Sequence, residues 1–489
     1  MNKIIFLAAL LSILSLTASA GNDKLALLPG DYPDPTVMRE GNDWYMTHSA
    51  FDYQPGLTVW HSTDLQHWEP ISFGLKTYLG SIWAPDICKY KDRYYIYFTV
   101  ARNPRTNCVV WADSPYGPWS DPVDLKVANI DPCHVVAQDG SRWLFMSGGK
   151  RVRLADDGLS VIPGTEETVY SGWQYPSDWV TEGLCLEGPK LRKIGQYYYY
   201  LNAEGGTAGP PTSHMVVQAR SQSLDGPWEN CPANPLIHTW DASEKWWSKG
   251  HGSLIDTPDG RWYCLYHAYQ NGFTNLGRQT LIDEVRLNDE GWFEVVDEDS
   301  QTMPAVSDSR LNLGRLGEFR PGLEWKFYKE YEPGRISVRD GVLSMQGRGT
   351  DAASSHPMMF VAGRTSYQIE AEIILHGDVR AGLLLYYNSD FFQGTGFDGQ
   401  KRYRYRKGSP SRSGLTGTQH LWLRLCNTNS IVTGYWSSDG KNWSRETWGM
   451  DCSGYNHNTL YEFQSVLPAL FVSGEGYAEF RNFRFTPSD

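Results

Sequence analysis

Polar residues that can transfer protons recur in five similar motifs along the first part of the chain. In each motif a titratable residue lies beside a proline or glycine and precedes a segment rich in aromatic residues. The motifs are PDPTV with Asp34, APDIC with Asp86, DPCHV with Asp131, EGPKL with Glu187 and GHGSLI with His251. Two carboxyl groups, one protonated and one ionised, are the parts that hydrolysis of a glycosidic bond requires. A single Asp-Pro is more typical of an ordinary turn, so the chemistry is indicated by the set.

Motifs for other reaction classes are missing from the sequence. No GxSxG or HExxH segment occurs, no phosphate-binding Walker loop is present, and no GxGxxG follows a strand and opens a helix. The eight cysteines are scattered and form no CxxC pair, which argues against a zinc site and a disulfide framework. They are interpreted as small buried hydrophobic residues, with one or two disulfides left open. The net charge of −12 argues against nucleic acid or an anionic membrane surface as partner.

A repeat of roughly fifty to sixty-five residues contains these motifs, which is within the range of propeller blades. The sequence has no long apolar stripe with a 3.6-residue period, so few helices are expected. The repeats predict an all-β fold with a five-bladed β-propeller over residues 25–300. A large β-sandwich would explain the strands but not their five-fold recurrence. The aromatic strands of the repeats begin near Trp44, Tyr94, Trp143, Tyr197 and Trp262.

The propeller interpretation predicts where the polar residues meet. Equivalent positions of successive blades converge at one end of the central axis, so the five motif residues should surround one point. Like charges at close range resist joint ionisation, so at least one carboxyl should have a raised pKa. The run of four tyrosines at 197–200 is expected to belong to the innermost strand of its blade.

The remaining segments predict export and a second domain. Residues 1–20 combine a lysine, an apolar run and the ending ASA, which indicates a secretory signal peptide without a lipid-attachment cysteine. The protein is therefore expected to be periplasmic or extracellular, with no membrane insertion. Residues 301–325 are interpreted as a connector. Residues 326–489 alternate apolar and polar side chains, which predicts a jelly-roll type β-sandwich that is structural or sugar-binding. Phe391, in a polar loop, is predicted to reach the active site.

The ordered set PDPTV, SIWAPDI, NIDPCHV, CLEGPKL, KGHGSLI and GRQTLIDEV, over about residues 30–290, resembles glycoside hydrolase family 43. The resemblance implies a five-bladed propeller that inverts the anomeric centre without a required cofactor. It also implies a preference for arabinose- and xylose-containing polysaccharides. The C-terminal segment is similar to the β-sandwich attached to many members.

The resemblance also implies roles for individual residues. Asp34 matches the general base, Asp131 matches the carboxylate that orients the acid and keeps its pKa high, and Glu187 matches the general acid. Substrate-binding positions and a histidine near a water-coordinated structural calcium follow in the same way. By this resemblance, Arg278 is expected to contact the sugar, Trp83 to line the pocket, Asp86 to be a binding or structural residue, and His251 to lie by a calcium on the axis, as in some members.

These features predict an exo-acting inverting glycosidase that releases a terminal pentose from plant polysaccharide or oligosaccharide. An α-L-arabinofuranosidase is preferred, followed by a β-D-xylosidase and then a β-galactosidase. A non-catalytic carbohydrate-binding protein is the remoter alternative. The excess of aromatic residues, with 20 Trp, 29 Tyr and 18 Phe, fits sugar stacking as well as β cores. The sugar, the linkage and the oligomeric state are left open.

Overall fold

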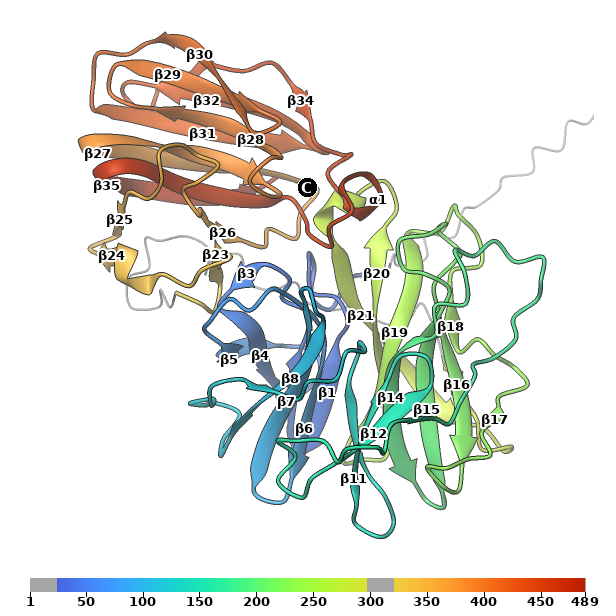
Figure 1. Cartoon of the computed structure of the whole chain (residues 1–489). Coiled ribbons are helices and arrows are strands. Elements are labelled where there is room, and N and C mark those ends of the chain that lie inside the picture. Colours follow the sequence, from blue (N-terminus) through green and yellow to red (C-terminus); the bar gives the residue numbers. More distant parts are fainter. Residues whose placement is uncertain (1–23, 297–320, 489) are drawn as a thin grey trace, which may run out of the picture.

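The computed structural model describes residues 24–296 and 321–488, which form a five-bladed β-propeller followed by a β-sandwich (Figure 1). The all-β prediction is therefore confirmed. The predicted signal peptide and most of the predicted connector lie outside the described residues. Within the described residues, no helix has the length and apolar character needed to cross a membrane.

Each blade is an antiparallel sheet, and its strands follow one another from the axis outwards. Blade one contains β1 (Thr36–Glu40), β2 (Asp43–Thr47), β4 (Gly56–Ser62) and β5 (Glu69–Leu75). Blade two contains β6 (Ser81–Tyr90), β7 (Arg93–Ala101), β8 (Thr106–Ala112) and β9 (Val123–Asp124). Blade three contains β10 (Cys133–Val136), β11 (Arg142–Met146), β12 (Lys150–Leu154) and β13 (Glu167–Thr168). Blade four contains β14 (Glu187–Ile194), β15 (Tyr197–Glu204), β16 (Met215–Ser221), β17 (Glu229–Asn230) and β18 (Ile237–His238). Blade five contains β19 (Trp246–Asp256), β20 (Trp262–Gln270), β21 (Arg278–Leu287) and β22 (Phe293–Val295).

The first strands of the five blades contact one another around the axis, and β19 returns to β1. The ring is closed by contacts between blade one, the preceding segment and blade five. The N–H of Leu27 donates to the carbonyl of Thr280 in β21 over 2.8 Å. Arg39 of β1 forms an ion pair with Asp256 of β19, with Nη2 and Oδ2 2.5 Å apart. These contacts hold the first and last blades in register.

The tyrosine run lies one strand further from the axis than the sequence predicted. It begins β15, the second strand of blade four, whereas the innermost strand is β14. All residues of β15 after Tyr197 are buried, because the second strand is covered by neighbouring blades on both faces. Strands covered on both faces have nearly continuous apolar sequences. The innermost strand borders the central channel and therefore keeps polar side chains.

The sandwich surrounds its own apolar core, which includes Trp325, Phe360 and Phe480. Its two longest strands, β27 and β35, pair along their length, and β27 pairs with β31 in its first part and β28 in its last. Its first strands are β23 (Trp325–Tyr328), β24 (Ile336–Arg339), β25 (Val342–Gln346), β26 (Met358–Phe360), β27 (Ser366–Tyr386), β28 (Phe392–Phe397) and β29 (Lys401–Arg406). The others are β30 (Ser409–Leu415), β31 (His420–Thr428), β32 (Ile431–Ser437), β33 (Ser444–Arg445), β34 (Met450–Asp451) and β35 (Leu467–Pro487). The short helix α1 (His457–Leu460) precedes β35, and two 3₁₀ turns lie at Thr274–Leu276 and Pro333–Arg335.

The sandwich is joined to the propeller by backbone pairing. The short strand β3 (Tyr53–Gln54), which leaves blade one, pairs with β23 of the sandwich. Residues 461–466, between α1 and β35, lie against the same part of blade one. There the Gln464 side-chain amide donates to Asp52 over 3.1 Å, and the Ser465 N–H donates to the Tyr53 hydroxyl over 3.0 Å. The sandwich is thereby fixed over the end of the propeller, with α1 above blade five (Figure 1).

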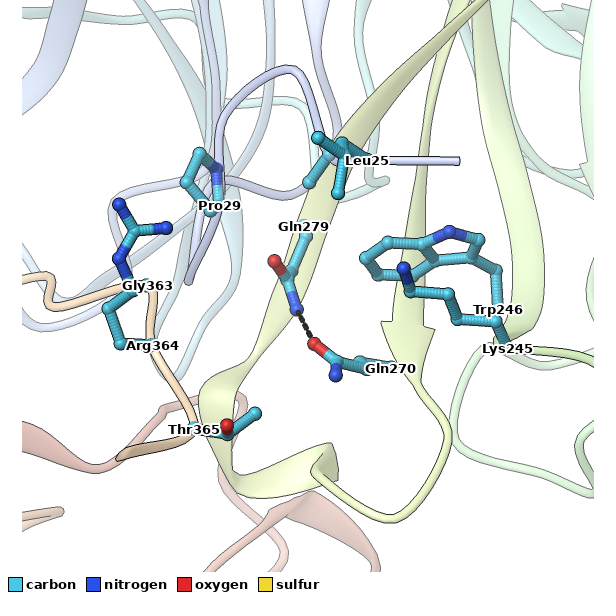
Figure 2. A pocket seen from close by; sticks show the side chains of 10 residues that line it. Leu25, Pro29, Lys245, Trp246, Gln270, Gln279, Gly363, Arg364 and Thr365 are labelled. Carbon is cyan, nitrogen blue, oxygen red and sulfur yellow. Dashed lines mark hydrogen bonds between the residues drawn. The ribbon is translucent and has the colours of Figure 1, made fainter. Parts of the chain in front are cut away.

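A pocket of about 210 Å³ lies between the N-terminal segment, blade five and the sandwich loop 363–365 (Figure 2). Figure 2 shows Trp246 on one side and the paired amides of Gln270 and Gln279 at the centre. The Gln279 Nε2 atom donates to the Gln270 Oε1 atom over 3.2 Å. None of the predicted site residues lines this pocket.

Candidate active site

Three of the predicted site residues share an unusual backbone conformation. Asp34, Asp131 and His251 have φ angles of 57°, 59° and 59°, which lie in the left-handed region. Asp and His tolerate this region better than most residues, but each such residue costs about 1–3 kcal/mol unless its surroundings hold it. Strained residues of this kind cluster at functional sites. The same local geometry therefore recurs at equivalent positions of blades one, three and five.

Asp34 is buried and held in its ionised form by a dense set of donors. Arg278 donates from Nη1 to Oδ1 over 3.0 Å and from Nη2 to Oδ2 over 3.3 Å. The Ser49 hydroxyl donates to Oδ2. Burial by itself would raise the pKa of Asp34, but Arg278, His251 and His267 outweigh it and hold the pKa well below its ordinary value.

Two histidines of blade five lie against the same carboxylate. The Nδ1 atom of His267 is 3.0 Å from Asp34 Oδ1 and 3.2 Å from the Asp34 backbone nitrogen. The Nδ1 atom of His251 is 3.3 Å from Asp34 Oδ1. Burial lowers the pKa of His251 to about 4 and that of His267 well below its ordinary value, so both imidazoles are neutral at pH 7. They fix the orientation of Asp34 without neutralising it.

Asp131 is buried beside the start of β14. Its Oδ2 atom accepts hydrogen bonds from the Ser147 hydroxyl over 3.1 Å and from the Gly188 N–H over 2.9 Å. Burial raises the pKa of Asp131 to about 6, although the Gly188 N–H opposes the shift. Because Gly188 directly follows Glu187, the hydrogen bond ties the Asp131 carboxyl to the backbone that carries Glu187.

Glu187 is the carboxyl of the site whose protonated form is favoured. Its side chain is partly exposed. Exclusion from water is the largest cause that raises its pKa well above the ordinary value, and the negative charges of Asp131 and Asp34 add to it. Glu182, the nearby glutamate that competes with Glu187 for the role of acid, is exposed to solvent. The structure thus combines a buried carboxylate whose pKa is lowered, Asp34, with a carboxyl whose pKa is raised, Glu187, and general acid and base catalysis needs such a combination.

Arg278 joins the propeller part of the site to the sandwich. Its guanidinium carbon lies 4.9 Å from the ring centroid of Phe463, in the sandwich loop 461–466. Phe463 also meets Trp83 of blade two edge-on, with centroids 5.6 Å apart. The structure therefore brings Trp83 to the site, together with a sandwich residue that sequence reasoning missed. The predicted residue Phe391 packs instead beside Tyr455, with centroids 5.8 Å apart.

Asp86 lies lower on the axis than the other acids. It lines a cavity of about 380 Å³ between the innermost strands, which Asp34, Asp131, Glu187 and His251 do not line. Its carboxylate binds the buried Lys190 ammonium over 3.1 Å and accepts the His134 N–H over 2.9 Å. These contacts occupy the carboxylate with a structural ion pair between blades two and four.

We expect Asp86→Ala to destabilise the protein without removing its chemistry. The change leaves Lys190 buried without its partner, and breaking a buried ion pair costs about 3–5 kcal/mol. Chemical denaturation should show this loss of unfolding free energy, while kcat at 25 °C stays within about twofold of wild type. An increased KM with unchanged stability would contradict this interpretation and support a substrate contact.

Among the described residues, Asp34, His251 and His267 are the group that could hold a metal ion. The group offers one carboxylate and two nitrogens, and the Arg278 cation already binds the same carboxylate. Calcium prefers six to eight oxygen ligands, so direct binding by this group does not fit calcium. The Nε2 atom of His251 has no hydrogen-bond partner among the described residues. A water-coordinated calcium beside this atom stays a prediction.

Three residues of the site were not found by sequence reasoning. They are His267, Ser49 and Phe463. His267 interrupts the aromatic strand WYCLYHAY, and a polar residue in an otherwise buried strand was the available signal. Phe463 is 185 positions from Arg278 and lies in a loop without periodicity, so the sequence offered no comparable signal.

Comparisons with known proteins agree with this geometry. The family described as Glycosyl hydrolases family 43 matches residues 25–293. Xylosidase/arabinosidase 43B of Humicola insolens is 29% identical over 408 residues, which cover 74% of this chain and 74% of the relative. Non-reducing end α-L-arabinofuranosidase BoGH43B of Bacteroides ovatus is 32% identical over 369 residues, covering 69% of this chain and 67% of the relative.

A solved structure is similar over nearly the whole chain. The GH43 protein BlXynB of Bacillus licheniformis superposes with a TM-score of 0.84 at 25% identity, covering 95% of this chain and 100% of that chain. The similarity therefore includes the sandwich as well as the propeller. The protein belongs to glycosyl hydrolases family 43 and is a glycoside hydrolase.

Proposed function

We propose that the protein is an exo-acting, inverting glycosidase that removes a terminal pentose from a plant polysaccharide or oligosaccharide. Asp34 is the general base that activates water, and Glu187 is the general acid that protonates the leaving oxygen. Asp131 positions Glu187 and, with Asp34, keeps its proton in place. The observation that carries the proposal is the pairing of Asp34, ionised by Arg278, with Glu187, whose pKa is raised. The reaction needs no cofactor.

We propose α-L-arabinofuranose as the preferred sugar and β-D-xylose as the second candidate. Support for both comes from the relatives, one of which is named a xylosidase/arabinosidase and another an α-L-arabinofuranosidase. The buried Arg278 supplies a fixed donor for a sugar hydroxyl, and Phe463 and Trp83 enclose its side of the site.

Hydrolysis of a panel of 4-nitrophenyl glycosides tests the proposed sugar. We expect kcat/KM for α-L-arabinofuranoside to exceed that for β-D-xyloside and β-D-galactoside by about tenfold or more, which corresponds to roughly 1.4 kcal/mol in transition-state binding. A higher value for the xyloside would replace the proposal by its second candidate. Proton NMR of the first-formed sugar tests inversion, because a retained anomer would exclude the water-activating role of Asp34.

We expect Phe463→Ala to weaken substrate binding because it removes the ring that holds the Arg278 guanidinium from the sandwich side. An exposed cation–π contact is worth about 0.5–1 kcal/mol and a desolvated one about 2 kcal/mol, so KM for the preferred aryl glycoside should rise by roughly 3- to 30-fold. Phe391→Ala, in the same sandwich, is the matched control and should leave KM unchanged. If KM rises in Phe391→Ala and stays unchanged in Phe463→Ala, then Phe391 is the sandwich residue that reaches the site.

We also propose that the protein is exported, with residues 1–20 as a cleaved signal peptide. The support is the sequence of this segment, in which an apolar run follows a lysine and ends in ASA. N-terminal sequencing of the protein secreted by an expression host should give Gly21 as the first residue.

A further inference from the structure

The segment that leads to Glu187 is unusually long. Residues 169–186 join blades three and four and contain no strand, and this is the longest of the four connections between successive blades. Connections longer than about 12–15 residues without secondary structure are uncommon in compact domains and are usually functional. Because Glu187 is the first residue of β14, the connection ends at the active site.

This connection and the end of blade four form an aromatic wall, which consists of Trp173, Trp179, His238 and Trp240. The rings of Trp179 and His238 stack in parallel with centroids 4.8 Å apart. Trp240 lies edge-on to Trp179 at 5.7 Å, and Trp173 lies 6.0 Å from Trp179. Trp240 is 61% exposed, and the neighbouring Val180 is 64% exposed. An apolar surface therefore faces solvent beside the connection that ends at Glu187.

The wall is held in place by hydrogen bonds from two of its backbone N–H groups and from the His238 side chain. The Trp173 N–H donates to the buried carboxyl of Glu204 over 2.6 Å. The Trp240 N–H donates to Glu244 over 2.6 Å. The carbonyl of Thr212 lies 2.8 Å from His238 Nε2. A fixed aromatic surface loses little conformational freedom when a ligand binds, which favours binding.

The wall adjoins the strand that begins with Glu187, because the Trp173 N–H donates to Glu204, and the preceding residue Ala203 pairs with Glu187. Glu182 follows Trp179 by three residues, a span of at most about 11 Å, and its charge acts on Glu187. The ring of Phe463 and the Arg278 guanidinium occupy the sandwich side of the site. Because the general acid protonates the leaving oxygen, the sugar attached to that oxygen must pass on the Glu187 side.

We propose that the aromatic wall binds the sugar chain attached to the leaving oxygen, through stacking of Trp240 and Trp179 on its rings. This inference rests on the proposed function and extends it to the leaving group. The acidic residues Asp178, Glu182 and Asp241 lie along the same segments, so the bound chain is neutral and not substituted with uronic acid. The substrate is accordingly a polymer or a long oligosaccharide, of which the cleaved pentose is a terminal unit.

Trp240→Ala tests the proposal through substrates of different length. The two long probes are an arabinofuranosyl-substituted xylo-oligosaccharide and xylohexaose, and the short probe is the preferred 4-nitrophenyl glycoside. We expect kcat/KM for the hydrolysed long probe to fall about tenfold, mainly through KM, while the short probe stays within about twofold. Trp240→Phe, which keeps an aromatic face, should recover most of the loss. Equal losses on long and short probes would overturn the proposal.

Binding without hydrolysis separates this proposal from the proposed function. Calorimetry of the full chain carrying Glu187→Gln should give xylohexaose an affinity about tenfold higher than when Trp240→Ala is added. Trp448→Ala is the matched control, since Trp448 is 74% exposed but lies in the sandwich. Equal affinity for xylohexaose with and without the Trp240 side chain would overturn the proposal that the aromatic wall binds the sugar chain. If no aryl glycoside is hydrolysed, the proposed function is overturned. The calorimetric comparison would then still show whether the aromatic wall binds the sugar chain.

Discussion

Glu187→Ala will lower kcat on glycosides with a sugar leaving group by ~10²–10⁴-fold, because these leaving groups depart only when their oxygen is protonated. Aryl glycosides with a good leaving group need little assistance from an acid, so their kcat should fall by less than roughly tenfold. The measurement is steady-state kinetics on a natural oligosaccharide and on a 4-nitrophenyl glycoside of the same sugar. Glu182→Ala is the matched control, because Glu182 is a nearby but exposed glutamate. Equal losses on both substrates would remove Glu187 from the role of acid.

We expect the same carboxyl to set the basic limb of the pH profile. Exclusion from water, followed by the charges of Asp131 and Asp34, raises the pKa of Glu187 well above its ordinary value. The active form is the protonated one, so kcat/KM should be retained below this pKa and lost as pH rises through it. Asp34 has a pKa well below its ordinary value and is the proposed base when ionised, so on the acidic side activity should be lost only as pH falls through this lowered pKa. In Glu187→Gln, assayed on the aryl glycoside, the basic limb should disappear.

Asp34→Asn will abolish hydrolysis of both classes of substrate. The water that attacks the sugar loses its base whatever the leaving group is, so kcat should fall by at least ~10²–10⁴-fold on both. Asparagine keeps the volume of the side chain but leaves the buried Arg278 without its carboxylate, so thermal unfolding and circular dichroism must accompany the kinetics. Asp86→Ala supplies the comparison, because it removes a buried acid of an equivalent motif that binds Lys190 instead. A loss confined to poor leaving groups would contradict the assignment of Asp34 as base.

The two kinetic patterns separate the two carboxyls. A split between substrates marks the acid, and a uniform loss marks the base. This difference follows from the charges that the structure places around each group. Arg278 donates twice to Asp34, whereas burial and the charges of Asp131 and Asp34 raise the pKa of Glu187.

Repetition in the sequence was sufficient to predict the propeller and to single out the acids that we propose for catalysis. Asp34, Asp131 and Glu187 precede aromatic strands at regular spacing, and equivalent positions of a closed ring must converge. The same argument placed Asp86 with them, but its carboxylate is bound to Lys190 lower on the axis. Two residues at equivalent positions of the repeat can therefore have side chains at different heights along the central channel.

The order of strands within a blade was also beyond the sequence. The tyrosine run was predicted at the axis because of its aromatic character, yet it lies one strand further out. A strand enclosed between two blades is buried on both faces and tolerates a continuous apolar run, whereas a strand on the channel must hold polar groups. The amino-acid composition of a strand indicates how deeply the strand is buried, but it does not indicate how far the strand lies from the propeller axis.

The sequence by itself determined the all-β class and the five-fold repeat, and it indicated the carboxyls that we propose for the chemistry, because these depend on local patterns that recur along the chain. Tertiary structure alone decided which charges neighbour each carboxyl, and hence the direction in which the pKa of each carboxyl shifts. It also decided that Phe463 of the sandwich, and not Phe391, lies on Arg278. Such contacts join residues far apart in the chain, and their pKa shifts and stacking depend on distances and burial that no local pattern encodes.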